Sequence, residues 1–404
     1  MITVKGDTFE SLSRRAYGSE SGAAQIRKAN PGYTSPFLAG VTVYIPAQIG
    51  APTNRSQRTA GDQVVVIIGG KKFQYWNEIL ITRSIDAPPA IELSAVWEPS
   101  NKELRDVFRP FSFKPIDIFL GDKKLFTGDM TTATPSTRND GSTITASALG
   151  KTAILSDCTP PASAFPLSFD DQSLDAIAAA LISPLGIAVE FEAGAGAPFD
   201  RVELQTGDQL MALIVKLAQQ RAVVVGETVD GAALFTKADS TGTPVAVLSA
   251  DAPPVLQIDA NFNTQNYYSH ITAIAPTIVG LKGEQVTVKN PYLTNILRPF
   301  TFQADDSGNE TLQQIAEAKA GRMFANMVSW SVSVATWYKP DGSTWQPGET
   351  VKLSGDTAMI YRPTVFLIRS VTLAQNQNSR TATLNLVLPG GFAGVIPEAL
   401  PWDE

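Results

Sequence analysis

The chain has 404 residues, 44% of them hydrophobic, and a formal net charge of −7. This length predicts about two to four domains with cores of their own, and the hydrophobic share excludes a disordered chain. The acidic balance argues against specific nucleic-acid binding, because neutralising phosphates requires a basic surface. One histidine and one cysteine exclude, within one chain, a His₃ or Cys₄ metal site and a disulfide, and we expect no metal and no cofactor. No apolar run approaches the roughly 20 residues that cross a bilayer, so no membrane span is expected.

The first 47 residues are predicted to form a separate small unit. The β-branched run Ile2-Thr3-Val4 suits a short strand, and Gly6-Asp7-Thr8 turns the chain into a helix that begins near Phe9. Residues 23–29 suit a second short helix, which the turn formers Asn30-Pro31-Gly32 end. Residues 38–45 give a closing strand. The predicted order is strand, helix, helix, strand.

This unit carries five short motifs in a fixed order: Val4-x-Gly6-Asp7-Thr8-Phe9-x-x-Leu12-Ser13, Ala16-Tyr17-Gly18, Ile26, Ala29-Asn30-Pro31 and Leu38-x-Gly40-x-x-Val43-x-Ile45-Pro46. With these motifs the unit resembles a LysM domain. LysM domains bind N-acetylglucosamine-containing glycans in a groove between two loops. The resemblance implies that this groove would involve Gly6, Asp7, Thr8, Phe9, Asn30 and Pro31. Glycan binding and a protein–protein clamp both stay open as uses, and so does a purely structural role of these residues as caps and turns.

Residues 48–62 carry no periodic apolar pattern and are rich in Gly, Ala, Thr, Gln and Arg. We therefore expect a linker. Fully extended, a segment of this length reaches about 50 Å, so the first unit can sit well away from the rest.

From Val64 onward, short strand-like runs recur at regular spacing, a pattern typical of β-barrels and sandwiches. Residues 116–120 and 125–127 flank Gly121-Asp122, which predicts a hairpin. Near the C-terminus, bulky residues alternate with small ones and predict a strand with one bulky face: Trp330, Val332, Val334, Thr336 and Tyr338.

The period becomes helical between about residues 165 and 237. One apolar stripe at helical spacing predicts a half-buried helix there: Leu210, Leu213, Ile214, Leu217 and Ala218. A hairpin around Asp230-Gly231 follows, and a further helix is expected near residues 310–325. The sequence therefore predicts a multidomain, mainly β fold with α+β parts and a compact α/β insert.

The sequence offers little for catalysis. A Ser-His-Asp or Cys-His site would have to use His270, which lies in a strand-like run with no nucleophile elbow nearby. Cys158 has no basic neighbour in sequence that would lower its pKa. We therefore expect no catalytic residues and no enzyme. The alternative is a LysM-targeted, peptidoglycan-associated cell-wall hydrolase, since a glycosidase needs only two well-placed carboxylates.

Several spans after residue 62 form a recognisable set. They include a strand, a Gly turn and a Thr-Gly strand, a segment that ends in an Asp-Cys pair, a helix with a Gly-Ile turn, and three C-terminal runs: Pro115-Ile116-Asp117-Ile118-Phe119-Leu120-Gly121-Asp122, Leu125-Phe126-Thr127-Gly128, Ala148 to Cys158, Leu174 to Val189, Trp345-x-Pro347-Gly348, Val365-Phe366-Leu367-Ile368 and Leu384-x-Leu386-x-Leu388-Pro389. Together these spans resemble the baseplate (tail) hub protein of contractile-tailed phages, especially of the Mu-like type. In the Asp-Cys segment, Leu149 and Gly150 replace the usual Gly-Arg.

The resemblance implies a structural baseplate hub of a contractile phage tail or of a phage-like injection particle, located in the tail baseplate of the virion. A hub subunit carries two similar β-barrel domains and forms a homotrimer, so six similar positions face a hexameric tail tube while the threefold face receives a trimeric spike. The implied partners are the spike, tail tube or tube-initiator proteins, and baseplate wedge proteins held through the LysM unit. Peptidoglycan is a further candidate partner.

The expected domains follow from these patterns and the resemblance together. They are a LysM domain at 1–47, a linker at 48–62, a first hub β-barrel domain at 63–164, an α/β insert at 165–238, a connecting β/α domain at 239–328 that partly completes the first barrel, a second hub β-barrel domain at 329–390, and a C-terminal tail at 391–404.

Overall fold

The computed structural model describes residues 3, 5–17, 23–43, 62–139, 141–194, 196–203, 207–238, 242–275, 283–304, 309–397 and 399–403. The chain divides into two compact units, residues 1–63 and 64–404, and each is described by itself. Most of the predicted linker lies outside the described residues, because these resume only at residue 62 after residue 43.

Two short helices organise the first unit. α1 (Phe9–Tyr17) and α2 (Ala23–Ala29) occupy the two segments that the sequence predicts to be helical. Their apolar residues share a small core, joined by residues of the following loop: Phe9, Leu12, Ala23, Ile26, Phe37 and Val43. The backbone N–H of Thr3 donates to the carbonyl of Val41 at 2.9 Å, so the beginning and the end of the described unit lie side by side.

The two flanking strands of the predicted LysM fold are not shown. Ile2, Val4 and residues 44–45 lie outside the described residues. Within the described part of this unit, Thr42 forms an isolated bridge and no strand is present. The first unit therefore shows two helices and one backbone pairing, and the full strand, helix, helix, strand order stays a prediction.

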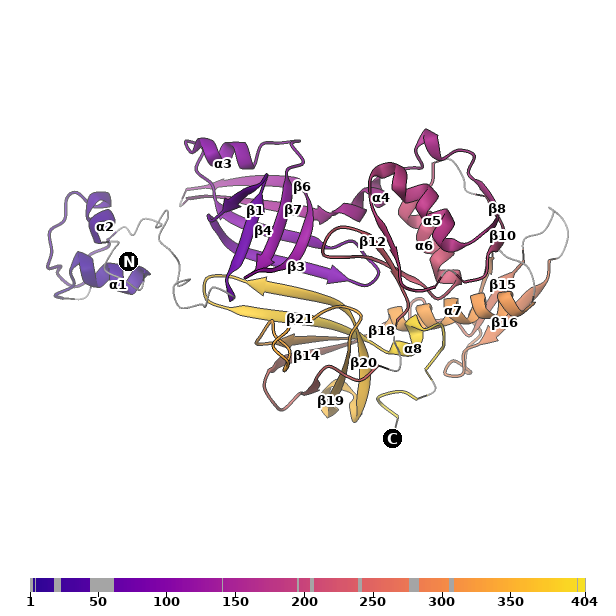
Figure 1. Cartoon of the computed structure of the whole chain (residues 1–404). Helices are drawn as coiled ribbons and strands as arrows, with labels where there is room; N and C mark the ends of the chain where they lie inside the picture. The colour runs from indigo at the N-terminus through magenta and orange to yellow at the C-terminus, as the bar shows by residue number, and fades with distance from the viewer. Residues whose placement is uncertain are drawn as a thin grey trace. The chain divides into compact units, whose positions relative to one another are not determined.

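One sheet of 13 strands dominates the second unit (Figure 1). The strands follow the order β14-β18-β21-β20-β3-β4-β7-β6-β5-β1-β2, while β19 pairs with β20, and β13 with β19. Their bounds are β1 Val64–Ile68, β2 Lys71–Phe73, β3 Trp76–Ser84, β4 Ala90–Val96, β5 Pro115–Leu120, β6 Lys123–Arg138, β7 Gly141–Gly150, β13 Val247–Ser249, β14 Val255–Phe262, β18 Val328–Val334, β19 Thr350–Gly355, β20 Ile360–Gln375 and β21 Arg380–Val387.

The same strand order occurs twice in this sheet. The N-terminal strand set is β3-β4-β7-β6-β5-β1, and the C-terminal strand set is β14-β18-β21-β20-β19-β13. In each set the fourth strand, β6 or β20, has 16 residues and continues through a tight turn into the third, β7 or β21. The sets differ at the end, since β1 is antiparallel to β5 whereas β13 is parallel to β19.

β-bulges fall at matching places in the two sets. The first strand is bulged between Trp76 and Glu78 in one set and between Val255 and Gln257 in the other. The long strand is bulged between residues 130 and 132 in β6 and between residues 368 and 370 in β20. A bulge sets the local bend and twist of a strand, so matching bulges show that the chain holds two copies of one β arrangement.

Alternation of apolar and polar residues buries one face of these strands. β18 shows this clearly, because Trp330, Val332 and Val334 are fully buried while the serines between them are half-buried. One hydrophobic cluster runs through both strand sets, from Val66 in β1 to Leu386 in β21. The large sheet is therefore held by a shared core as well as by its hydrogen bonds.

An α/β insert lies between the two sets in the chain. Its elements are α4 Ile154–Asp157, β8 Ser168–Gln172, α5 Leu174–Ile182, β9 Val189–Phe191, β10 Phe199–Glu203, α6 Leu210–Gln220, β11 Val224–Glu227 and β12 Ala233–Thr236. The predicted stripe of α6 packs into the core of the insert, and β11 and β12 form the predicted hairpin.

A second small sheet, β16-β15-β17, packs on the long helix α7. The bounds are β15 His270–Ile274, β16 Gln285–Lys289, β17 Pro299–Gln303 and α7 Asn309–Met327. α7 confirms the helix predicted near residues 310–325. Two further short helices complete the second unit, α3 Lys102–Val107 and α8 Pro389–Phe392.

The structure corrects one expectation about residues 239–328. We expected this segment to complete part of the first β-barrel. Instead, β13 pairs with β19, and β14 pairs with β18, so these strands belong to the C-terminal strand set. The sequence alone did not reveal this, because strand pairing across the 65 residues between β14 and β18 leaves no local pattern.

Candidate functional site

The two strand sets meet along β3 and β20. The two strands pair antiparallel over six residue pairs, from Ser370↔Ser84 to Gln375↔Ile79. The hydroxyls of Thr82 and Thr372, which are opposite each other, lie 3.2 Å apart and share a hydrogen bond. This junction makes one continuous sheet of the two sets (Figure 1).

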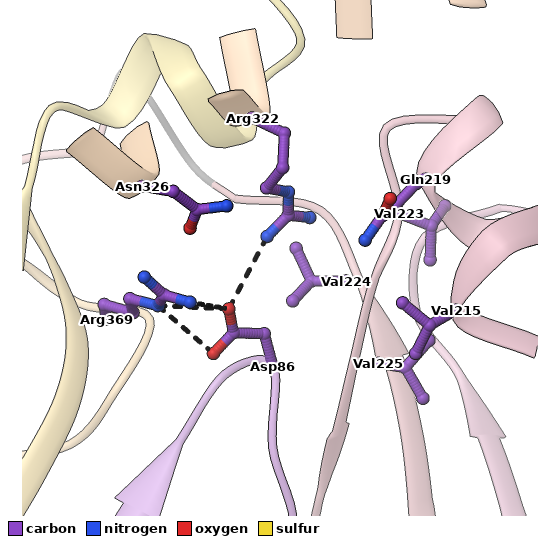
Figure 2. Close-up of a pocket in the computed structure, with 9 residues that line it drawn as sticks. All are labelled: Asp86, Val215, Gln219, Val223, Val224, Val225, Arg322, Asn326 and Arg369. Atoms are coloured by element: carbon purple, nitrogen blue, oxygen red, sulfur yellow. Dashed lines mark hydrogen bonds and ion pairs between the residues drawn. The ribbon is translucent and has the colours of Figure 1, made fainter. Parts of the chain in front are cut away.

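A charged cluster closes the end of this junction (Figure 2). Asp86 lies just after β3 and pairs with Arg369 of β20. The Oδ2 of Asp86 is 2.8 Å from the Nη2 of Arg369 and 3.1 Å from its Nε. Arg322 of α7 approaches the same carboxylate from the other side, with Nη1 at 3.7 Å. The guanidinium of Arg322 also lies 4.0 Å from the ring centre of Phe392 in α8.

Burial lowers the pKa of Arg322 to about 10, although the charge of Asp86 opposes this shift. The cluster borders a cavity of about 120 Å³, whose other walls come from α6 and β11 of the insert. Figure 2 shows the two arginines pointing toward the Asp86 carboxylate, with valines of the insert on the opposite side. The cluster therefore ties β3, β20, α7 and α8 together beside the insert, and it offers no nucleophile for chemistry.

A second tie joins the insert to the N-terminal strand set. Glu227, at the end of β11, is 6% exposed and accepts hydrogen bonds from the N–H groups of Lys151 and Thr152, at 3.0 and 2.8 Å, and from the Thr152 hydroxyl. Burial raises the pKa of Glu227, while these donors act in the opposite direction. Gly150 permits the approach, because a Cβ there would lie 2.5 Å from the carboxylate oxygens.

Asp86, Arg322, Arg369 and Glu227 were not among the predicted site residues. They come from four separate stretches of the chain, and no spacing in the sequence links them. A charged residue inside an otherwise apolar strand, such as Glu227 after Val224-Val225-Gly226, is the one signal that sequence inspection could have used.

The six predicted groove residues of the first unit fall into two groups. Phe9 is 1% exposed and packs edge-to-face on Phe37, with ring centres 5.0 Å apart. Asn30 is buried, and its Nδ2 donates to the carbonyl of Ile26 at 2.8 Å, at the end of α2. These two side chains hold the fold of the unit.

Gly6, Asp7, Thr8 and Pro31 lie nearer the surface. The Oδ1 of Asp7 accepts a hydrogen bond from the Ser11 hydroxyl at 3.0 Å, while its Oδ2 pairs with Arg15 at 2.6 Å. Gly6 and Asp7 also hold the loop before Val43: the Gly6 N–H donates to the Phe37 carbonyl at 3.0 Å, and the Phe37 N–H donates to the Asp7 carbonyl at 2.7 Å. The structure thus brings the two predicted loops together by their backbones. Whether they bind a ligand stays a prediction.

His270 and Cys158 occupy structural positions. His270 lies in β15, and its Nδ1 is 2.9 Å from the hydroxyl of Ser269, which also accepts the N–H of Arg298 at 2.8 Å. Ser269 is 2% exposed, so its hydroxyl is closed to a substrate. Cys158 ends α4, and its carbonyl accepts the N–H of Leu210 at 3.0 Å.

Within the described residues, no group of three or more His, Cys, Asp or Glu side chains is placed to hold a metal ion. The helices of the same residues include none with the length and apolar character needed to cross a membrane.

Comparisons with known proteins agree with the resemblance after residue 62. Residues 152–237 match the family model of the second domain of baseplate hub protein gp44-like proteins. The chain is also 24% identical over 345 residues to the baseplate hub protein gp44 of Escherichia phage Mu, and the match covers 80% of this chain and 87% of that protein.

Two solved structures share the fold. The 43 kDa tail protein of prophage MuSo2 from Shewanella oneidensis is 23% identical with a TM-score of 0.69, covering 81% of this chain and 99% of that one. The tail protein from Neisseria meningitidis MC58 is 19% identical with a TM-score of 0.69, covering 82% of this chain and 99% of that one.

The fold and the family match together define a class, the structural proteins of phage tails, with a mainly β multidomain architecture. Within this class, the matched domain and the gp44 relative support a Mu-like baseplate hub protein, a structural component of the virion and not an enzyme. The alternative of a cell-wall hydrolase is therefore wrong.

Proposed function

We propose that this hub protein forms a homotrimer that adapts the sixfold symmetry of a tail tube to the threefold symmetry of a spike. The observation that carries the proposal is the strand order that occurs twice in one sheet. Three chains with two similar strand sets each present six similar positions on one face. The insert and the first unit occur only once per chain. Wherever they form the surface, the same three chains therefore present only three similar positions.

The composition supports an assembled protein. Charged residues make up 18% of the chain, against about 25% in typical soluble proteins. Large apolar side chains also stay exposed on the second unit, among them Phe111 at 97% and Leu297 at 74%. These side chains are available for contacts with partner proteins.

Light scattering of the purified full-length chain tests the trimer. We expect about 130 kDa, three times the chain mass of 43.2 kDa. A single species of one chain mass, both alone and with the spike protein present, contradicts the proposal.

The proposed partners follow from the symmetry. Tail tube or tube-initiator proteins would bind the face with six similar positions, and a trimeric spike would bind the threefold face. Co-expression with each partner, followed by mass measurement, tests this assignment. We expect one trimer of this chain to bind one spike trimer. The measured mass should therefore correspond to a 1:1 molar ratio of this chain to the spike protein.

For the first unit we propose a LysM module that acts as a clamp on a neighbouring baseplate protein, such as a wedge protein. Two of its six predicted groove residues, Phe9 and Asn30, are buried in the fold of the unit. The side chain of Asp7 is engaged by Ser11 and Arg15. These contacts leave only part of the predicted groove for a glycan and support the clamp over glycan binding.

Deletion of residues 1–47 separates the two uses. If the module is a clamp, the truncated chain still forms the trimer, but particles assemble poorly or lose peripheral baseplate proteins. If the module binds glycan, particles assemble normally and the truncated chain no longer sediments with insoluble peptidoglycan. The second result would refute the clamp.

A further inference from the structure

The guanidinium of Arg322 is nearly buried and donates no hydrogen bond within the described residues. Its side chain is 12% exposed, and the Oδ2 of Asp86 lies 3.7 Å from its Nη1, beyond hydrogen-bond distance. The guanidinium also faces the ring of Phe392, with its Cζ 4.0 Å from the ring centre. An aromatic face attracts the positive charge but accepts none of the five N–H donors in a directed hydrogen bond. Arg322 therefore keeps donors available in the interior of the second unit.

These donors open onto the cavity of about 120 Å³ that the charged cluster borders. None of the buried side-chain nitrogen or oxygen atoms of the described residues is sealed off without a partner, so the Arg322 nitrogens reach open space. Gln219 of α6 and Asn326 of α7 line the same cavity, and Figure 2 shows them on either side of Arg322. The cavity has room for several water molecules, and therefore for one small ion. Asn326 is exposed, which brings solvent to the rim of the cavity.

Positive charge is in excess around this cavity. Asp86 balances one of the two arginines, and both of its oxygens are engaged: Oδ2 lies 2.8 Å from the Nη2 of Arg369, and Oδ1 accepts the Ser84 hydroxyl at 2.7 Å. Lys319, one turn before Arg322 in α7, adds a further positive charge. Burial lowers the pKa of Lys319, and so does the charge of Arg322. A buried charge without full compensation is destabilising, so a bound anion would stabilise the cluster.

We propose that this cavity is a binding site for a small oxyanion such as inorganic phosphate. Arg322 would supply the charge and two parallel N–H groups, the arrangement with which arginine binds paired oxygens. The amides of Gln219 and Asn326 would donate to the remaining oxygens. The valines of the insert that form the opposite wall exclude water, which strengthens polar contacts inside the cavity.

A bound oxyanion would also join the insert to the charged cluster. Asp86, Arg322 and Arg369 lie after β3, in α7 and in β20, whereas Gln219 belongs to α6 of the insert. One ion that accepts from both Arg322 and Gln219 would link α7 to α6 across the cavity. This inference does not depend on the proposed trimer, because every residue of the site belongs to one chain.

Titration of the purified full-length chain with inorganic phosphate tests the site. Phosphorus NMR detects the bound ion through broadening of the phosphate signal, and sodium chloride keeps the ionic strength constant, so that general screening does not change. We expect saturation at one phosphate per chain. The Tm should rise with phosphate concentration, because a ligand that binds only the folded state stabilises it. If the wild type shows no saturable binding up to about 20 mM phosphate, the proposal is wrong.

Arg322→Met removes the guanidinium and keeps a long side chain beside Phe392. It should weaken phosphate binding at least about tenfold, the usual loss for a hydrogen bond to a charged group. Arg221→Met is the matched control: the Cζ of Arg221 also lies 4.0 Å from the ring centre of a phenylalanine, Phe199, but Arg221 is not among the residues that line this cavity. Its phosphate binding should stay within about twofold of the wild type. Equal weakening in the two variants would mean that phosphate responds to general charge, and would refute the site.

A second variant keeps the test decisive if Arg322→Met does not fold. Val215→Phe places a larger side chain at the cavity wall on α6 and leaves every charge of the cluster in place. Val215 is only half-buried, and circular dichroism establishes that the variant is folded. We expect saturable phosphate binding to be lost, because the added ring occupies the space of the ion. Unchanged binding in the folded variant would put the ion elsewhere and overturn the proposal.

Discussion

Replacing Glu227 with alanine tests how the insert is tied to the N-terminal strand set. The substitution leaves two N–H groups without their acceptor, the half-buried one of Lys151 and the buried one of Thr152. Each orphaned buried donor costs about 1–3 kcal/mol. Losing the carboxylate also removes the desolvation that raises the pKa of Glu227, which offsets part of this cost. We expect the free energy of local opening to fall by about 3 kcal/mol, which raises the equilibrium constant for opening roughly 100-fold.

Hydrogen exchange measured by mass spectrometry is the direct assay, because the two affected amides are themselves the reporters. Peptides that cover residues 150–153 should exchange roughly 100-fold faster in Glu227→Ala. Asp230→Ala is the matched control in the same hairpin: its side chain is 74% exposed and pairs with Lys124, so exchange should change by less than about twofold. If exchange of residues 150–153 is unchanged in Glu227→Ala, this account of the tie is refuted.

Three further predictions concern stability. Burial raises the pKa of Glu227 in the folded chain above its ordinary 4.5, so above about pH 4.5 the folded chain binds more protons at this carboxyl than the unfolded chain does. The wild type should therefore lose stability relative to Glu227→Gln as the pH rises above about 4.5. A difference in Tm that is constant with pH contradicts this prediction. Asp86→Ala leaves Arg322 without its carboxylate and should lower the free energy of unfolding, measured in urea, by about 3 kcal/mol. Adding Arg322→Met removes the uncompensated charge and should restore part of this stability. If it restores none, the uncompensated charge is not the cause of the loss. Trp330→Ala should cost about 3–5 kcal/mol, whereas Tyr361→Ala, at a side chain that is 50% exposed, should change stability little; equal losses would refute the burial argument.

Local elements were largely predictable from the sequence. The apolar stripe of α6 is buried as its spacing predicts, and the Gly121-Asp122 turn joins β5 to β6. The bulky face of β18 was predicted too, but its strand ends at Val334. Beyond the end of this strand Trp337 is fully buried, and its Nε1 donates to the carbonyls of Ala374 and Thr381.

The long-range arrangement was not predictable in the same way. β3 and β20 lie almost 300 residues apart, and their pairing depends on the folded positions of both strand sets. The repeat is also hidden in the sequence, because matched positions share strand order and bulges but not residue types: Ile81 corresponds to Ala260, and Leu373 to Pro135. The charged ties at Asp86 and Glu227 escaped prediction for the same reason, since their partners come from other parts of the chain.

The length of β20 has a mechanical consequence. Its first half pairs with β19, while its second half lies between β3 and β21. A force that pulls the two strand sets apart along the strand direction therefore loads the β3–β20 hydrogen bonds in shear, since these bonds run across the strands. Bonds in shear share a load and fail together, whereas bonds peeled from one end fail one at a time. Because one strand belongs to both sets, the chain resists separation of the two sets most strongly along the strand direction.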